Sequence, residues 1–179
     1  MRQEERKPVK RCINSCDTAY VEHTFEPVFD SASRVLVLGS IPSPKSREQG
    51  FYYGHPRNRF WPVLARVLGE EQPGTIEEKK ALVLSRHVAV WDVLAGCDIH
   101  GADDGSIRNP RPNDLNRIIG QAPIQAIFTT GAKAGALYKR FCRPATGMDA
   151  ILLPSTSPAN CRMTEEVLVA AYSAILEFL

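Results

Sequence analysis

The sequence has no long apolar segment. Every uncharged stretch is too short, or too often interrupted by glycine and proline, to span a bilayer as a helix. The N-terminal residues MRQEERKPVKR also lack the apolar core of a secretory signal peptide. We therefore expect a cytoplasmic protein that does not associate with membranes.

Cysteine is scarce, with five residues among 179, an odd number. Cys12 and Cys16 are separated by three residues, whereas Cys97, Cys142 and Cys161 stand alone. A zinc or iron–sulfur site of the usual spacing needs a second close pair, so the sequence predicts neither. A site in which the dispersed cysteines converge stays open. We expect reduced thiols, no metal and no other cofactor.

Low-complexity tracts and internal repeats are also absent. The composition, 44% hydrophobic and 23% charged, is typical of a globular protein. The length suits one domain. We expect residues 1–20 to form a charged arm and residues 21–179 to form that domain.

The net charge is only +2, which by itself argues against a protein that binds nucleic acid. The charge is segregated, however. Residues 39–66 and residues 131–143 each carry +4, the first eleven residues carry +3, and the rest of the chain carries −9. A surface that faces DNA phosphates needs a local excess of this kind. Chance clustering on solvated faces explains the charge pattern equally well.

Runs of β-branched and aliphatic residues predict strands at 34–38, 87–92, 124–130 and 148–154. Helical spacing and capping residues predict helices that begin near residues 58, 75, 112, 131 and 164. Residues 96–107, which are acidic and contain glycine, are expected to form a loop. The alternation of strands and helices indicates an α/β fold with a parallel sheet covered on both faces.

Two loops follow strands at the edge where such sheets bind ligands. The first, residues 39–57, begins with Gly39, which permits a tight turn, and its prolines stiffen it. Aromatic side chains beside arginines suit a stacked base and its phosphates. This loop and the residues just after it contain three aromatic residues and two arginines, namely Phe51, Tyr52, Tyr53, Arg57 and Arg59.

The second loop, residues 154–161, carries hydroxyl and amide side chains on a turn braced by proline. Hydroxyl groups can position phosphates without reading sequence. Between the two loops in the chain, Asn58 stands where a helix is expected to begin. From its position alone, capping of that helix is the favoured role, and binding of a water molecule or of the sugar is the alternative.

The segments GSIPSPKSREQGFYYGHPRNRFW and LPSTSPAN resemble the two signature motifs of the uracil-DNA glycosylase superfamily, most of all its hypoxanthine-DNA (deoxyinosine) glycosylase branch. The resemblance covers residues 25–179. It implies a three-layer α/β/α sandwich with a four-stranded parallel sheet. It also implies an enzyme without a cofactor that flips a deaminated base out of double-stranded DNA and hydrolyses its N-glycosidic bond. The expected base is hypoxanthine, with uracil and xanthine as further candidates.

The resemblance also implies a set of site residues. In the mismatch-uracil branch a catalytic Asn lies two residues after the first glycine of the motif, and here that position is Ile41, which cannot orient water. In the hypoxanthine branch the Asn of the N-R-F-W segment serves as the catalytic residue instead. The resemblance therefore favours a catalytic role for Asn58 in addition to capping. The implied base pocket comprises Gly39, Ser40, Ile41, Pro42 and Tyr53, with Tyr53 stacked on the flipped base.

The implied DNA contacts come from both loops. Hydroxyl groups of Ser43, Ser46, Ser155 and Ser157 would grip phosphates, and residues 156–159 would fill the gap that the flipped nucleotide leaves. Arginines beside the first loop would contact the backbone. The complete set is Ser43, Ser46, Arg57, Arg59, Ser155, Thr156, Ser157, Pro158, Ala159 and Asn160.

Two other functions stay open. One is the same fold acting on uracil in mismatches with G, on mismatched thymine, or on uracil in single strands. The other is a nucleotide-binding α/β module without activity, because TTGAKAG (129–135) places Gly131 at a strand-to-helix turn. Neither G-x-G-x-x-G nor G-x4-G-K-[ST] is present, so we expect Gly131 to be a turn residue. Nothing in the sequence indicates an oligomer, and a monomer is expected.

Overall fold

A parallel sheet of four strands forms the centre of the computed structural model, which describes residues 18–179. The strands are β2 (Val35–Gly39), β3 (Val88–Asp92), β6 (Ala126–Thr130) and β7 (Ala150–Leu153), in the order β3-β2-β6-β7. Each neighbouring pair is parallel. All residues of β2 and β3 are buried, as expected for strands covered on both faces. The four predicted strands and their parallel arrangement are confirmed.

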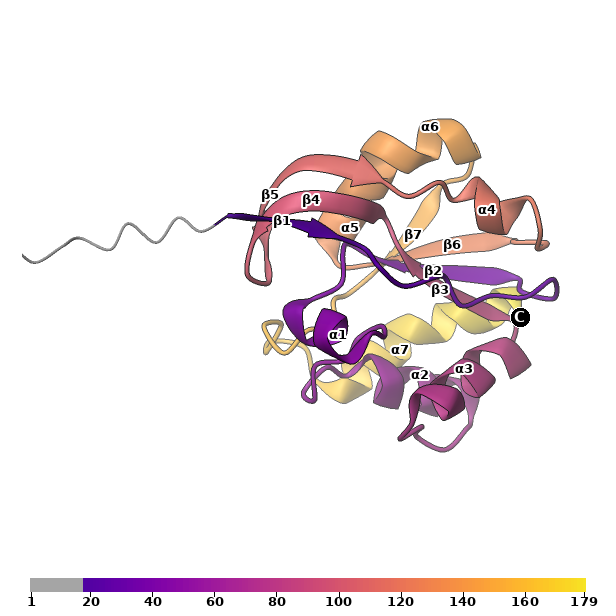
Figure 1. The fold of residues 1–179 in the computed structure, drawn as a ribbon. Coiled ribbons are helices and arrows are strands. Elements are labelled where there is room, and N and C mark those ends of the chain that lie inside the picture. The colour runs from indigo at the N-terminus through magenta and orange to yellow at the C-terminus, as the bar shows by residue number, and fades with distance from the viewer. Residues whose placement is uncertain (1–17) are drawn as a thin grey trace, which may run out of the picture.

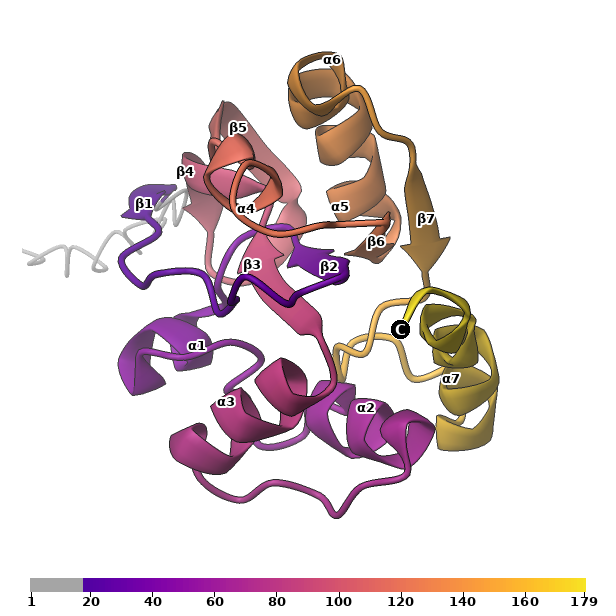
Figure 2. The same ribbon diagram turned by 90° about the vertical axis from the view of Figure 1, so that its right-hand side faces the viewer.

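Helices cover both faces of this sheet (Figures 1 and 2). On one side lie α2 (Phe60–Leu68), α3 (Ile76–Ser85) and α7 (Glu165–Tyr172), which continues as the 3-10 helix η2 (Ser173–Phe178). On the other lie α4 (Asn116–Ile119), α5 (Ala132–Leu137) and α6 (Arg143–Thr146), with the π-helical turn η1 (Tyr138–Cys142) between the last two. The three-layer α/β/α sandwich is therefore confirmed, although the helix expected from Gly131 is divided.

The helix ends follow from local sequence. Thr75 and Glu78 form a capping box at the start of α3, in which each side chain accepts the backbone N–H of the other. The hydroxyl of Thr164 accepts the Val167 N–H at 3.4 Å at the start of α7. Gly69 ends α2 in the left-handed conformation, with φ 70°. These caps hold the helices at the boundaries that the sequence predicts.

The prediction of a loop at residues 96–107 is wrong. This segment belongs to an antiparallel hairpin of β4 (Leu94–His100) and β5 (Asp103–Pro112), which pairs with β1 (Ala19–Glu22) as a second sheet. The register shifts at several points along the hairpin, and aspartate and glycine obscure its alternation. Within residues 96–107, only Cys97, Ile99 and Ile107 are buried apolar residues. Those few positions are too sparse to predict strands.

The arm expected over residues 1–20 falls mostly outside the described residues, together with Cys12 and Cys16. Its last two residues, Ala19 and Tyr20, belong to β1 and pair with β4. Among residues 18–179 no helix has the length and apolar character needed to cross a bilayer. The same part of the chain holds no cluster of three His, Cys, Asp or Glu side chains that suits a metal ion.

Candidate active site

One pocket of about 140 Å³ lies at the carboxyl ends of the central strands. Three segments that are far apart in the sequence meet there: the loop after β2, the tip of the β4–β5 hairpin and the loop after β7 (Figure 1). Most of the predicted site residues line it, namely Gly39, Ser40, Ile41, Pro42, Ser43, Ser46, Tyr53, Asn58, Ser155, Thr156 and Ser157. The structure thus brings the two predicted loops together around one cavity.

The loop after β2 contains a short helix that the sequence did not predict, α1 (Pro44–Gln49). Ser43 caps it by accepting the Ser46 N–H at 3.2 Å, and Pro44 occupies the first turn. The Ser46 hydroxyl is buried and accepts the Gly54 N–H at 3.0 Å, which ties the helix to the rest of the loop. The predicted phosphate contact of Ser46 is therefore wrong, because its side chain holds the loop together. Ser43 is partly exposed at the pocket and keeps its predicted role.

The three aromatic residues of this loop have different roles. Phe51 and Tyr52 are buried in the core, where the Tyr52 hydroxyl donates to the Glu26 carbonyl at 2.8 Å, so these two anchor the loop. Tyr52 and Tyr53 both line the pocket, and Tyr53 is the less buried of the two. Tyr53 adopts a left-handed backbone conformation, φ 52°, and its ring stacks on Phe60 with centroids 3.7 Å apart. Burial raises the pKa of Tyr53, so its hydroxyl stays neutral.

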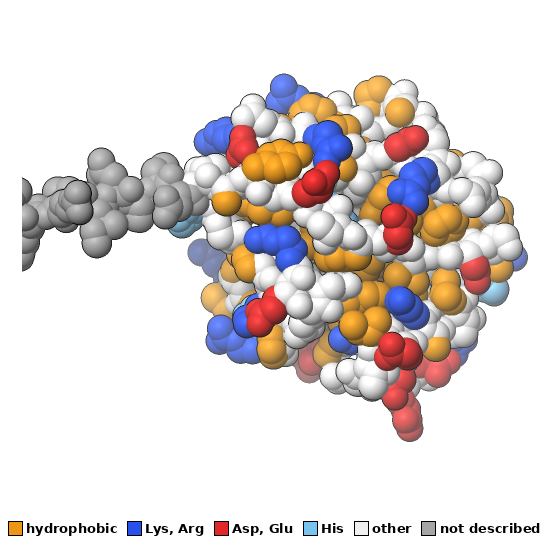
Figure 3. Space-filling model, viewed as in Figure 1, with side chains coloured by type: hydrophobic (Ala, Val, Ile, Leu, Met, Phe, Trp, Pro, Cys, Tyr) orange, Lys and Arg blue, Asp and Glu red, His pale blue; other side chains and the backbone are white. Residues whose placement is uncertain are grey.

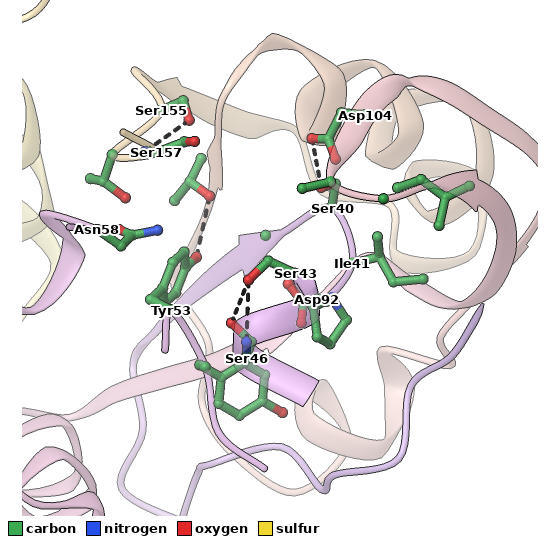
Figure 4. Close-up of a pocket in the computed structure, with 18 residues that line it drawn as sticks. Ser40, Ile41, Ser43, Ser46, Tyr53, Asn58, Asp92, Asp104, Ser155 and Ser157 are labelled. Carbon is green, nitrogen blue, oxygen red and sulfur yellow. Dashed lines mark hydrogen bonds between the residues drawn. The ribbon is translucent and has the colours of Figure 1, made fainter. Parts of the chain in front are cut away.

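Asn58 lines the pocket and also caps a helix. Its Oδ1 accepts the Phe60 N–H at 3.0 Å at the start of α2. That contact fixes the orientation of the amide, and the Nδ2 group points into the cavity (Figure 4). Asn58 therefore presents a hydrogen-bond donor to a bound molecule. Ile41, at the position where the mismatch-uracil branch has its catalytic Asn, lines the same cavity with an apolar side chain.

Asp92, which sequence reasoning missed, lies in the pocket at the end of β3 and is only 4% exposed. Its Oδ2 lies 3.0 Å from His23 Nε2. A Cβ atom on Gly39 would lie 2.2 Å from Asp92 Oδ1, so only glycine leaves room for this carboxylate. Residue 39 must therefore be glycine because the Asp92 carboxylate packs closely against it. The backbone of Gly39 does not have a positive φ. The position of Asp92 at the end of a buried strand was the signal that could have found it.

Asp104, the second carboxylate that sequence reasoning missed, comes from the β4–β5 hairpin. Its Oδ2 accepts a hydrogen bond from the Ser40 hydroxyl at 2.8 Å. Burial raises the pKa of Asp104, and the negative charge of Asp92 raises it further. No sequence signal marked this residue, because the segment that carries it reads as a loop.

The loop after β7 is held by contacts within the protein. Ser155 Oγ accepts the Ser157 N–H at 3.2 Å, and Asn160 Nδ2 donates to the Ser155 carbonyl at 2.8 Å. Thr156 is 2% exposed, so it cannot enter the gap in a DNA duplex, and that part of the prediction is wrong. The Asn160 amide likewise braces the loop. Pro158, half-buried, and Ala159, exposed, remain the predicted wedge.

The two arginines beside the first loop differ. The Arg59 guanidinium donates to two carbonyl groups of the second loop, Asn160 at 2.8 Å and Ser157 at 3.5 Å, and to the Met163 carbonyl just beyond it. These bonds occupy the groups expected to contact the DNA backbone, so the prediction for Arg59 is corrected. Arg57 is exposed and keeps its predicted role. Basic side chains gather along the left edge of the face in Figure 3, the side of the strand ends.

The turn at Gly131 is not a phosphate loop. The Gly131 N–H donates to the Leu153 carbonyl at 2.8 Å. A Cβ atom on Gly131 would lie 3.2 Å from the Ser155 side chain, and φ is 94°. Gly131 is thus the turn residue that the sequence predicts, closely packed against the second loop.

A family model described as the uracil DNA glycosylase superfamily matches residues 26–176. The chain belongs to the uracil-DNA glycosylase superfamily. It is therefore a DNA glycosylase, an enzyme that hydrolyses the bond between a base and its deoxyribose. The resemblance of the two loop motifs to this superfamily is confirmed.

The proteins similar to this glycosylase include two curated proteins and a solved structure. A hypoxanthine DNA glycosylase of Methanosarcina acetivorans is 32% identical over 147 residues, 81% of this chain and 92% of that protein. A hypoxanthine DNA glycosylase of Methanosarcina barkeri is 32% identical over 140 residues, 77% and 87% of the two chains. A solution NMR structure from Methanosarcina acetivorans, described as a candidate uracil DNA glycosylase, superposes with a TM-score of 0.73 at 29% identity. That superposition covers 88% of this glycosylase and 99% of the other chain.

Proposed function

We propose that this glycosylase removes hypoxanthine from double-stranded DNA and leaves an abasic site. The names of its two curated relatives support this choice of base. The observation that carries the proposal is the position of the Asp92 carboxylate in the pocket. In the same pocket the apolar Ile41 occupies the position where the mismatch-uracil branch has its catalytic Asn. We propose a monomer as the active unit.

Deamination changes one edge of a base in a way that a carboxylate can read. In adenine the ring nitrogen beside the amino group accepts a hydrogen bond, whereas in hypoxanthine the same nitrogen carries a hydrogen and donates one. His23 occupies Oδ2 of Asp92, which leaves Oδ1 as an acceptor for that N–H. A buried acceptor left unpaired is costly, so adenine is disfavoured in this pocket.

The remaining pocket residues position the nucleotide. The flipped base lies along the Tyr53 ring, whose other face is fixed on Phe60. Asn58 approaches from the side of Ser155 and Ser157, as Figure 4 shows, and its Nδ2 orients the water or the sugar oxygen by donating a hydrogen bond. Glycosidic cleavage develops positive charge on the sugar and negative charge on the base, and groups positioned in advance stabilise both.

Uracil is the second candidate base. It presents the same arrangement of a ring N–H beside a carbonyl, so Asp92 would accept a hydrogen bond from it as well. The superposed NMR structure, described as a candidate uracil DNA glycosylase, also favours uracil as a substrate of this pocket. Xanthine carries the same ring N–H and is the third candidate.

A panel of duplex oligonucleotides tests the proposal. Each carries one inosine, uracil, xanthine or mismatched thymine, and alkaline cleavage at the abasic site reports base release. We expect the highest single-turnover rate with inosine. A higher rate with uracil would assign the protein to uracil repair, and an absence of cleavage on all four would contradict the proposed function.

A further inference from the structure

Two carboxylates lie in the same pocket in different surroundings. The Oδ2 atom of Asp92, at the end of β3, lies 3.0 Å from the His23 ring nitrogen Nε2. Asp104, from the β4–β5 hairpin, accepts only the neutral Ser40 hydroxyl among its hydrogen-bond contacts in the described chain. Both approach the cavity from the side remote from Asn58 (Figure 4). Pairs of carboxyl groups in unlike surroundings divide the roles of acid and base in enzyme sites.

The charged groups that face Asp104 determine when it holds a proton. Asp92 and the neighbouring Asp103 raise the pKa of Asp104, in addition to the dominant effect of burial. The Ser40 hydroxyl and Lys133, which comes from α5, lower it, and the net pKa is raised. On β4, burial and nearby acids raise the pKa of Cys97 to about 11. That thiol therefore stays neutral and adds no charge near Asp104. Asp104 thus keeps its proton at a higher pH than an exposed aspartic acid does.

We propose that Asp104 is the general acid that protonates the leaving purine on its imidazole ring. This role rests on the proposed function and narrows it to purines, because uracil has no imidazole ring. Hypoxanthine presents N7 on the side of the purine opposite N3, and N7 accepts a proton without disturbing the N–H that Asp92 reads.

The step balances as a hydrolysis. The Asp104 proton moves to N7, the bond between C1′ and N9 breaks, and its electron pair stays with the base, which leaves as a neutral molecule. Water adds to C1′ and loses one proton to solvent, and the Asp104 carboxylate regains one from solvent. The neutral base is a better leaving group than the anion, and general acids of this kind contribute roughly 100-fold to 10,000-fold in rate.

The test uses two substrates that differ in one atom. One duplex carries 2′-deoxyinosine, and the other carries 7-deaza-2′-deoxyinosine, which has C–H in place of N7 and cannot be protonated there. Asp104→Asn is compared with Asp114→Asn, an exposed aspartate outside the pocket whose Oδ1 accepts the Asn116 N–H at 3.1 Å. We expect Asp104→Asn to lower single-turnover cleavage of inosine by about 100-fold and to leave the slow 7-deaza reaction within about threefold of wild type. Asp114→Asn should match wild type on both.

The pH profile of the wild-type protein gives a second test that needs no variant. The inosine rate should be highest where Asp104 is protonated and should fall as pH rises through its raised pKa, whereas the 7-deaza rate should lack this limb. Equal losses of both substrates in Asp104→Asn, or an inosine rate unchanged by it, would overturn the general acid. A wild-type protein that cleaves none of the deaminated bases would instead overturn the proposed function itself.

Discussion

The Asp92 carboxylate packs against the Cα of Gly39, so closely that a Cβ on residue 39 would lie 2.2 Å from Oδ1. The two residues end neighbouring strands and are paired in the register of β2 and β3. This contact places a carboxylate at the base of the pocket, between the two strand ends, and it makes the pocket sensitive to a single added methyl group.

Gly39→Ala should therefore displace Asp92 and lower cleavage of inosine by about 100-fold, while the protein still folds with a loss of roughly 1–3 kcal/mol, the usual cost of overpacking. Single-turnover cleavage and urea unfolding measure the two effects. Gly74→Ala is the matched control, because its Cβ would lie 3.5 Å from the Glu78 carboxylate, an ordinary contact. Full activity in Gly39→Ala would show that the position of Asp92 does not matter.

Asp92→Asn should weaken the choice of base more than the fold. An amide can donate as well as accept, so it reads the ring N–H less well than a carboxylate does. The variant should therefore cleave inosine at least about tenfold more slowly than Asp114→Asn, a variant at an exposed position. Wild-type protein should not cleave DNA that carries 1-methylinosine, in which a methyl group replaces the hydrogen that Asp92 accepts. Efficient cleavage of the methylated base would contradict this role of Asp92.

The two arginines predict opposite results. Arg57 is exposed, so Arg57→Ala should reduce the slope of log affinity for DNA against log salt concentration by about one. Arg59 donates to carbonyl groups of the loop after β7, so Arg59→Ala should leave the slope unchanged and speed amide exchange in residues 154–163. Fluorescence anisotropy over a salt series and hydrogen exchange separate the two. A reduced slope in Arg59→Ala would restore the DNA contact that its loop bonds argue against.

The central sheet could be predicted because its strands are short runs of β-branched and aliphatic residues that are buried on both faces. The β4–β5 hairpin could not, because glycine, aspartate and shifts in register remove its alternation. That error concealed Asp104, since the carboxylate reaches the pocket only when the hairpin forms.

The two loops at the pocket could be predicted, but the partners of their side chains could not. The contact of His23 with Asp92 spans 69 residues, and the bond from Arg59 to Asn160 spans 101. The resemblance placed Arg59 and Thr156 at the DNA, because nothing in the local sequence shows that Arg59 binds carbonyl groups and that Thr156 is buried. Asn58 was predicted to combine capping and catalysis, and the structure shows the cap and a free amide facing the pocket.

The central claim is that the Asn58 amide serves the cleavage of a deaminated base, and Asn58→Ala tests it most directly. Loss of the cap should cost about 1 kcal/mol, which leaves the variant folded. Single-turnover cleavage of an inosine duplex by the folded variant should fall by about 100-fold or more. Cleavage at the wild-type rate would contradict the account.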